Sequence, residues 1–202
     1  LNTGLFIDNF TFRSASPCQD FGDAPSSYGT LLAGNGARHS IPSYNAAAKT
    51  APLMLGSNIG AETEGQPASD ASADTFDDGL VPGSVSLLPG ATTAQASVRA
   101  VNATPVPANL AGWIDFNNNG TFEPGERAQV TVPANTNIAT AFTLNWSGFA
   151  ALPVSFSSFA RFRIATSAAD VAVPTGLAAD GEVEDYRVPT VPAFATCDTR
   201  AF

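Results

Sequence analysis

The stretch GWIDFNNNGTFEPGERAQVTV, residues 112–132, places a polar, turn-forming segment between two runs with β-strand character. In the second run, Ala128, Val130 and Val132 alternate with polar residues. This alternation is typical of a strand with one buried and one solvent-facing side. The stretch therefore predicts two strands joined by a loop, and it is the starting point for the rest of the fold.

The same alternation recurs in AQASVRAV (94–101), IATAFTLN (138–145) and FSSFARFRI (156–164). Ile138, Phe142 and Leu144 are expected on one face of their strand. The chain contains 17 Gly and 15 Pro, which interrupt it at short intervals, and no long segment has helical spacing. The sequence predicts an all-β fold: an antiparallel β-sandwich, jelly-roll-like.

The composition limits the classes of partner. The chain has 202 residues, of which 44% are hydrophobic, and 9 basic residues against 18 acidic ones give a net charge of −9. Nucleic acids and anionic membrane surfaces require clustered Lys and Arg, so neither is expected as a partner. No apolar run approaches the roughly 18 residues needed to span a bilayer, so membrane insertion is not expected.

Two segments stand apart from the alternating runs. Residues 1–14 are expected to form a strand, either the last strand of a preceding domain or an edge strand of this one, while residues 15–202 form the main domain. The start within a strand-like pattern suggests a piece of a longer protein. Residues 61–79, AETEGQPASDASADTFDDG, form a long acidic loop without periodicity, and such loops are usually functional or disordered.

The two cysteines, Cys18 and Cys197, lie almost at opposite ends of the chain. They are either two unrelated buried thiols or a disulfide that joins the ends of the domain. We predict the disulfide because the cysteines flank the region that carries the motifs. A disulfide implies an oxidising compartment.

The polar segment within 112–132 matches the calcium-binding loop of EF-hands at each ligand position. The predicted Ca²⁺ ligands are Asp115 at position 1, Asn117 at 3, Asn119 at 5, the Thr121 carbonyl at 7, Glu123 at 9 and Glu126 at 12. Gly120 at position 6 permits the sharp turn. The flanks are strands, so this is a calcium loop between β-strands and not an EF-hand domain. The alternative is an ordinary Asn/Gly-rich turn.

A second acidic group is DGEVEDY, residues 180–186. Arg161 and Arg163 are expected on the solvent-facing side of the preceding strand, where they would pair with Glu182 and Glu184 across adjacent antiparallel strands. The alternative is a second metal site. Its candidate ligands are Asp20, Asp23, Asp77, Asp78, Glu182, Glu184 and Asp185.

Six motifs in a fixed order resemble the GEVED domain of large bacterial surface and adhesin-like proteins. They are DFGDAPSSYGT (20–30), GARH (36–39), LGSNIGAETEGQP (55–67), GWIDFNNNGTFEPGE (112–126), RFRI (161–164) and TGLAADGEVEDY (175–186). The resemblance covers about residues 20–190 and implies a secreted β-sandwich module in a multidomain chain. The family often has a denser Asp run where this chain reads SDASADTFDDG, which weakens the case for a metal site in that loop.

These observations favour a non-catalytic, calcium-stabilised structural or adhesive module of an extracellular or cell-surface bacterial protein. Its expected partners are neighbouring domains of the same chain and a cell-surface glycan or protein. The alternative is a calcium-dependent carbohydrate-binding domain, with a stacking platform formed by Trp113, Trp146, Tyr28 and Tyr44. An enzyme ranks last, because the single histidine, His39, has no recognisable catalytic partners, although paired carboxylates leave a glycosidase open.

Overall fold

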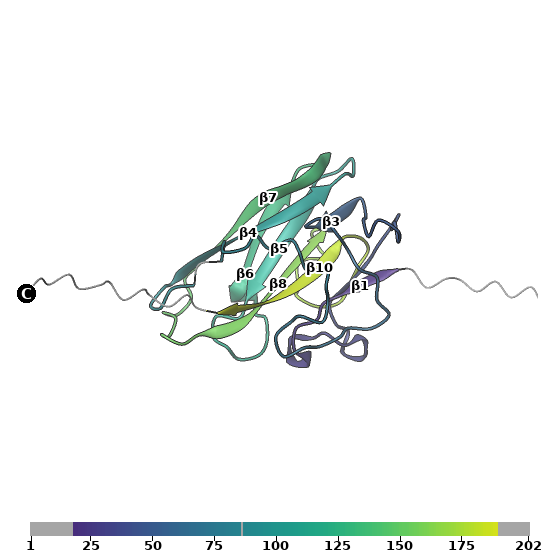
Figure 1. Cartoon of the computed structure of the whole chain (residues 1–202). Coiled ribbons are helices and arrows are strands. Elements are labelled where there is room, and N and C mark those ends of the chain that lie inside the picture. Colours follow the sequence, from purple (N-terminus) through teal and green to yellow (C-terminus); the bar gives the residue numbers. More distant parts are fainter. Residues whose placement is uncertain (1–17, 86, 190–202) are drawn as a thin grey trace, which may run out of the picture.

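The computed structural model describes residues 18–85 and 87–189, whose regular structure is almost entirely β (Figure 1). The strands are β1 (Gln19–Phe21), β2 (Arg38–Ser40), β3 (Leu53–Leu55), β4 (Thr93–Asn102), β5 (Ala108–Ile114), β6 (Arg127–Val132), β7 (Thr136–Ser147), β8 (Ser157–Ala165), β9 (Leu177–Ala178) and β10 (Glu182–Pro189). The 3₁₀ turns are η1 (Ser26–Tyr28), η2 (Leu32–Gly34) and η3 (Pro124–Glu126). No helix in these ranges has the length and apolarity needed to cross a membrane. The strand expected within residues 1–14 lies outside the described residues.

Two antiparallel sheets pack face to face and confirm the predicted sandwich. One has the strand order β10-β8-β5-β6 and the other β3-β4-β7, which lies above it in Figure 1. The main core fills the space between them. Leu110 and Phe162 come from the first sheet, Val98 and Leu144 come from the second, and all four are fully buried. Burial of side chains of this size stabilises a fold by about 1.5–3 kcal/mol each.

The second face of the four-stranded sheet is covered as well. A small sheet of order β1-β2-β9 and the segment around η1 lie against it, with Ala24 and Tyr28 packed near Trp113. The expectation that Arg161 and Arg163 face solvent is therefore wrong, because both side chains are fully buried. Much of this cover comes from β1, β2 and the η1 segment, which lie far from β8 in the sequence, so the alternation within β8 alone could not reveal it.

Strand β7 departs from the predicted pattern near its start. Between Ala100 and Asn102 of β4 the paired residue moves from Thr140 to Thr136 of β7, a register shift of the kind that a β-bulge produces. Leu144 is fully buried as expected, whereas Ile138 is 76% exposed and Ala139 packs against a secondary core in its place. The expectation that Ile138 shares a buried face with Leu144 is therefore wrong.

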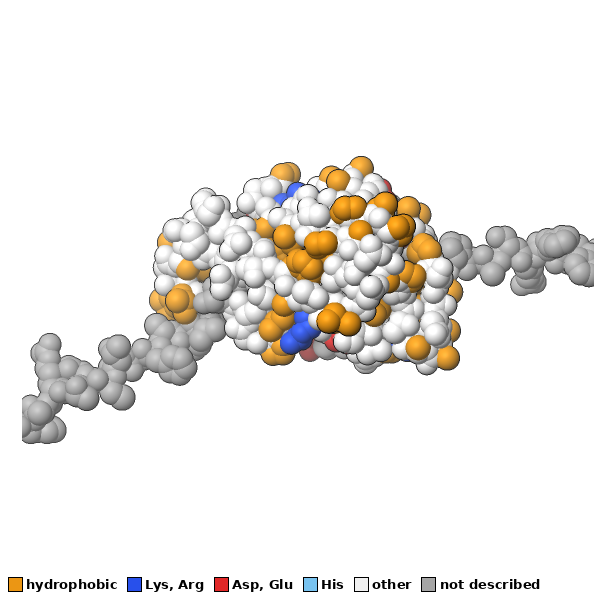
Figure 2. Space-filling view, turned by 90° about the horizontal axis from the view of Figure 1, so that it is seen from above, with side chains coloured by type: hydrophobic (Ala, Val, Ile, Leu, Met, Phe, Trp, Pro, Cys, Tyr) orange, Lys and Arg blue, Asp and Glu red, His pale blue; other side chains and the backbone are white. Residues whose placement is uncertain are grey.

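The face of the molecule seen in Figure 2 carries few charged side chains. Figure 2 shows hydrophobic side chains in several separate groups among uncharged polar atoms, while Lys and Arg side chains appear at only a few points of that face.

The predicted disulfide cannot be placed. Cys18 is exposed just before β1, and Cys197 lies outside the described residues. We expect peptide mapping of the unreduced protein by mass spectrometry to find the peptides of these two cysteines linked. Two free thiols in protein from an oxidising compartment would contradict the pairing.

Candidate functional site

The loop of residues 115–126 joins two neighbouring strands of the four-stranded sheet. It leaves β5 at Asp115 and enters β6 through η3, and the adjacent strand ends pair Trp113 with Arg127. The short antiparallel connection holds both ends of the loop in place. All six predicted calcium ligands therefore belong to one anchored loop.

Asp115 organises the inside of this loop. Its side chain is fully buried, and its Oδ2 accepts hydrogen bonds from the Tyr28 hydroxyl at 2.8 Å and the Gly120 N–H at 2.9 Å. Its Oδ1 accepts a longer bond of 3.2 Å from the Asn119 N–H. Gly120 has a φ of +83°, which a residue with a side chain rarely adopts. The glycine thus allows the chain to turn back over the carboxylate.

The exposed rim of the loop is held by amide side chains. The Nδ2 atoms of Asn117 and Asn119 donate to the two carboxylate oxygens of Glu123, at 2.9 and 3.1 Å. The Asn119 Oδ1 accepts from the N–H and the hydroxyl of Thr121, at 3.0 and 2.8 Å. The last two bonds form the kind of local turn that Asn favours. Calcium ligation by the Asn119 Oδ1 would compete with them.

Glu126 closes the loop through a capping box on η3. Its Oε1 accepts from the Phe116 N–H and its Oε2 from the Glu123 N–H, both at 2.9 Å. Burial, with the charge of Asp115 nearby, raises the pKa of Glu126 to about 7. Both oxygens thus satisfy main-chain donors, and calcium ligation by this carboxylate requires it to give up at least one of these bonds.

The predicted neighbours β8 and β10 are adjacent and antiparallel, but the predicted ion pairs across them are wrong. Glu182 lies opposite Ile164 and Glu184 opposite Phe162, on the face of the main core. Asp185 lies opposite Arg161 instead. Residues opposite each other in antiparallel strands share a face, so the register excludes the predicted pairs.

Arg161 and Asp185 form a fully buried ion pair. The Arg161 Nε and Nη2 donate to the two carboxylate oxygens of Asp185, both at 2.7 Å, and neither side chain is exposed. The remaining guanidinium nitrogen, Nη1, donates to the carbonyl oxygens of Tyr28, Gly29 and Pro174. Two-pronged geometry of this kind adds both strength and orientation. The pair fastens the η1 segment to the sheet.

Arg163 and His39 form a second buried arrangement. The Arg163 Nε donates to the His39 Nε2 at 3.0 Å, so the His39 Nδ1 carries the proton and donates to the Asp180 carbonyl at 2.7 Å. Burial, and next the charge of Arg163, hold the pKa of His39 well below its usual value. Arg163 also donates to the carbonyls of Val173, Thr175 and Gly176. His39 is thus a neutral, hydrogen-bonded core residue.

Glu182 and Glu184 each hold a distant segment against β10. Glu182 accepts from the Leu55 N–H of β3 at 2.5 Å, and Glu184 accepts from the N–H groups of Asp78 and Gly79 at 3.0 and 2.9 Å. Burial raises the pKa of Glu184 to about 8. Both carboxylates therefore act as acceptors for loop and strand backbone within the fold.

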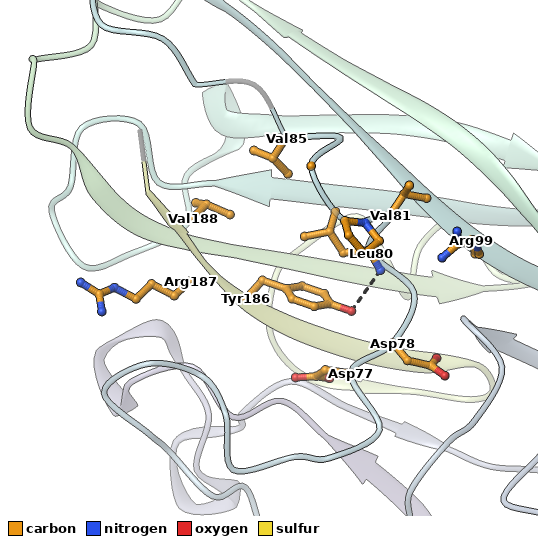
Figure 3. A pocket seen from close by; sticks show the side chains of 11 residues that line it. Asp77, Asp78, Leu80, Val81, Val85, Arg99, Tyr186, Arg187 and Val188 are labelled. Carbon is orange, nitrogen blue, oxygen red and sulfur yellow. Dashed lines mark hydrogen bonds between the residues drawn. The ribbon is translucent and has the colours of Figure 1, made fainter. Parts of the chain in front are cut away.

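A pocket of about 590 Å³ lies beside the end of β10 (Figure 3). Asp77 and Asp78 lie at one end, and Leu80, Val85 and Val188 form an apolar wall. Tyr186 projects between them, with its hydroxyl accepting from the Leu80 N–H at 3.1 Å and donating to Glu184 at 2.9 Å. The pocket is thus mainly apolar, with acidic groups confined to one end.

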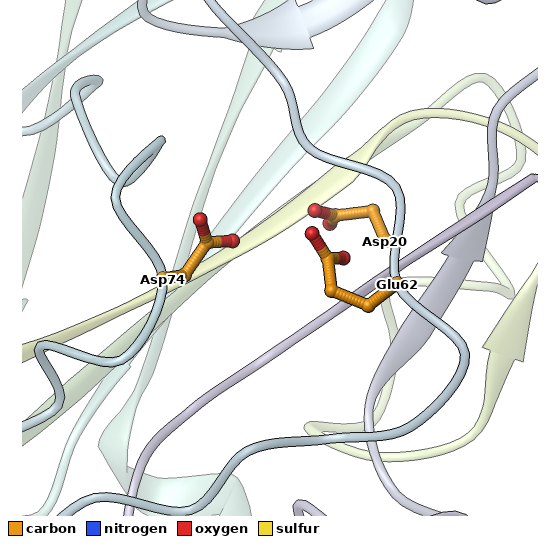
Figure 4. A group of neighbouring side chains, drawn as sticks. All are labelled: Asp20, Glu62 and Asp74. Atoms are coloured by element: carbon orange, nitrogen blue, oxygen red, sulfur yellow. The ribbon is translucent and has the colours of Figure 1, made fainter.

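Three carboxylates from separate segments converge near β1 (Figure 4). Asp20 lies in β1, Glu62 pairs with Gln19 in an isolated bridge, and Asp74 lies in the acidic loop. One carboxylate oxygen from each lies within 4.8 Å of the others. Asp20 was one of the candidate ligands of a second metal site in the sequence analysis, whereas Glu62 and Asp74 were not among those candidates. The only signal in the sequence was the acidic character of residues 61–79.

Burial raises the pKa values of this acidic centre, defined as Asp20, Glu62 and Asp74. The pKa of Asp20 is well above its usual value, because the side chain is fully buried and Glu62 lies close by. Burial, and next the charge of Asp74, raise the pKa of Glu62 to about 7. The pKa of Asp74 is raised by burial too. The centre is therefore a place where negative charge is poorly accommodated.

Two further candidates, Asp23 and Asp77, lie around this centre. The Asp23 Oδ2 accepts from the N–H groups of Ala73 and Asp74, at 2.6 and 2.9 Å. Burial raises the pKa of Asp23 to about 6 and that of Asp77 well above its usual value. Asp78 is exposed, and its Oδ1 accepts from the Ser57 N–H at 2.8 Å. Asp23 thus positions the segment that carries Asp74.

The predicted aromatic stacking platform does not form. Trp113, Trp146 and Tyr28 are 1%, 4% and 5% exposed, so their rings belong to the cores. The Trp146 Nε1 donates to the Glu126 carbonyl at 2.7 Å, which fixes the end of the loop. Only Tyr44 of the four is partly exposed. The prediction that Trp113, Trp146 and Tyr28 stack against sugars is therefore wrong.

Comparison with known proteins gave one match. Residues 109–189 match the family model of the GEVED domain. Searches of curated proteins and of solved structures found no match. The matched range runs from β5 through the loop 115–126 to the end of β10 and includes the Arg161–Asp185 pair. The chain therefore contains a GEVED domain.

Proposed function

We propose that this protein is a non-catalytic, calcium-stabilised structural or adhesive module of a large bacterial cell-surface or secreted protein. The main support for the proposal is the burial and hydrogen bonding of the charged residues on β8 and β10. Arg161, Glu184 and Asp185 are fully buried and bonded to other parts of the fold. Catalytic carboxylates need access to substrate, and these side chains instead join strands to loops.

Calcium stabilisation rests on the spacing and conformation of the loop 115–126. Asp115 and Gly120 adopt the arrangement that a turn around an ion requires, with the carboxylate inside and the glycine at positive φ. The Asp115 Oδ1 has only a single bond of 3.2 Å within the loop. A bound ion would also compensate the charge of Glu126, whose pKa is raised by burial and by the nearby charge of Asp115.

Thermal melts with calcium or EGTA test this stabilisation. We expect the melting temperature of the whole chain to rise in millimolar calcium and fall in EGTA. An ion that binds only the folded state stabilises it by about 2.7 kcal/mol at a hundredfold excess over Kd. Extracellular calcium modules typically have Kd values of about 10⁻⁴ to 10⁻³ M.

Variants of Asp115 locate the effect. Asp115→Asn keeps the shape of the side chain but replaces one carboxylate oxygen with an NH2 group and removes the charge, and Asp115→Ala removes the ligand. Both should reduce the calcium-dependent shift, while Asp70→Asn, a charge change on an exposed side chain, should retain it. Equal shifts in the parent and both Asp115 variants would leave the loop an ordinary turn.

A glycan array with and without EGTA, followed by assays of the same glycans for cleavage, separates the rival functions. The proposal expects no turnover. Calcium-dependent binding of one glycan class without cleavage would favour the carbohydrate-binding alternative, carried by surfaces other than the buried tryptophans. Turnover would overturn the assignment as a non-catalytic module.

A further inference from the structure

The acidic centre has the dimensions of a cation site. One oxygen from each of Asp20, Glu62 and Asp74 lies within 4.8 Å of the other two. Calcium binds oxygens at about 2.3–2.6 Å, so two ligands of one ion are at most about 4.6–5.2 Å apart. In Figure 4 the Asp74 carboxylate points toward the other two from the opposite side. Even if all three separations were 4.8 Å, an ion at the centre would lie about 2.8 Å from each oxygen, so a small inward shift of the side chains brings all three within binding distance.

An unpartnered oxygen provides independent support. Asp20 is fully buried, and its Oδ2 accepts from the Val183 N–H at 2.7 Å. Its Oδ1 is buried and has no hydrogen-bond partner among residues 18–85 and 87–189. A buried carboxylate oxygen left without a donor or an ion is strongly unfavourable. The geometry therefore leaves a ligand position open at the centre.

The charges nearby do not neutralise Asp20. The charged groups that act on its pKa are Glu62, Asp74 and Glu184, and all are carboxyls that raise it. Lys49 lies close enough to lower the pKa of Glu62. Its ammonium, however, lies over the rings of Tyr44 and Phe76, and the one ion pair found among the described residues is Arg161–Asp185.

An ion could enter from the surface. A hollow of about 450 Å³ has Glu62 and Asp74 in its wall, together with Glu64 and Thr75. Water in this hollow could complete the six to eight oxygens that calcium prefers. Asp23 supports the arrangement, because its carboxylate accepts the N–H groups of Ala73 and Asp74.

We propose that Asp20, Glu62 and Asp74 bind one calcium ion, distinct from any ion in the loop 115–126. The three ligands come from β1, from the bridge beside Gln19 and from the acidic loop. The ion fastens the long irregular segment 56–79 to β1. It also supplies the partner that the Asp20 Oδ1 lacks.

Calcium titration calorimetry on the whole chain, together with melts in calcium, magnesium and EGTA, tests the site. Asp20→Asn removes the charge and keeps the shape of the side chain. We expect this variant to bind one calcium ion fewer than the parent. In EGTA it should melt at or above the parent temperature because a buried charge is gone, and in calcium it should melt below the parent.

Two further variants keep the result interpretable. Asp70→Asn in the same acidic loop should bind calcium as the parent does, because Asp70 is exposed and outside the centre. Asp115→Asn should remove only the loop ion. If Asp20→Asn alone removes an ion, this site exists and the loop proposal fails. If Asp115→Asn alone removes one, the loop proposal holds and this site does not.

Three other results would overturn the inference. The first is an unchanged calcium stoichiometry in Asp20→Asn. The second is an equal loss of melting temperature in calcium and in EGTA, which indicates a purely structural role. The third is tighter binding of magnesium than of calcium, which would contradict the assigned ion.

Discussion

Asp185→Ala is expected to lower the free energy of unfolding by about 3–5 kcal/mol, the range observed when one partner of a buried ion pair is removed. Arg161 would then keep its charge in a fully buried position without its two bonds of 2.7 Å. The Ala24 N–H, which donates to the Asp185 Oδ2 at 2.8 Å, would lose its acceptor as well. Urea unfolding followed by the fluorescence of the buried Trp113 and Trp146 measures the loss.

Two comparisons isolate the ion pair. Arg187→Ala removes an arginine whose side chain is exposed, and it should change stability by at most about 0.5 kcal/mol. The double variant Arg161→Met/Asp185→Leu should lose less than the sum of its single variants, because no unpaired charge remains. A loss below about 1 kcal/mol for Asp185→Ala would contradict the assigned role of the pair.

Gly181→Ala is expected to destabilise the domain by about 2–5 kcal/mol. Gly181 precedes β10 and has a φ of +89°, which costs an L-residue roughly 1–2 kcal/mol. A Cβ built on it also collides with the carbonyl oxygen of Ile164, and relief of such overpacking costs about 1–3 kcal/mol more. The same urea unfolding experiment measures the change.

Gly83→Ala is the matched control for this substitution. Gly83 has a φ of +73°, and nothing lies within 4 Å of the position that an added Cβ would occupy. It therefore carries the backbone penalty without the collision. Equal losses at both glycines would show that the close approach of Gly181 to β8 contributes nothing.

The local β structure was predictable from the sequence because alternation reports on each strand by itself. It identified the strands around 94–101, 127–132 and 156–164, and the adjacency of β8 and β10 followed from their matching charge patterns. The layer that covers the second face of the four-stranded sheet was not predictable. It depends on Ala24 and Tyr28, which lie more than a hundred residues before β8, so Arg161 looked like a solvent-facing residue.

The candidate sites also differ in how far the sequence could predict them: a site built from consecutive residues was predictable, and one assembled by folding was not. The loop 115–126 was located from consecutive residues, and the structure brings all six of them into one anchored loop. The ion pairs failed because a shift of one position decides which face a residue occupies, and Asp185 took the place expected for the glutamates. Glu62 and Asp74 were missed because chain folding alone brings them to Asp20.

Anomalous X-ray diffraction from crystals of the whole chain grown with calcium would show directly whether calcium binds the folded protein. We expect one calcium peak bonded to Asp115 within the loop 115–126 and a second between Asp20, Glu62 and Asp74. The absence of both peaks at millimolar calcium, with the Glu126 capping box and the Asp20 Oδ1 unchanged, would contradict this expectation.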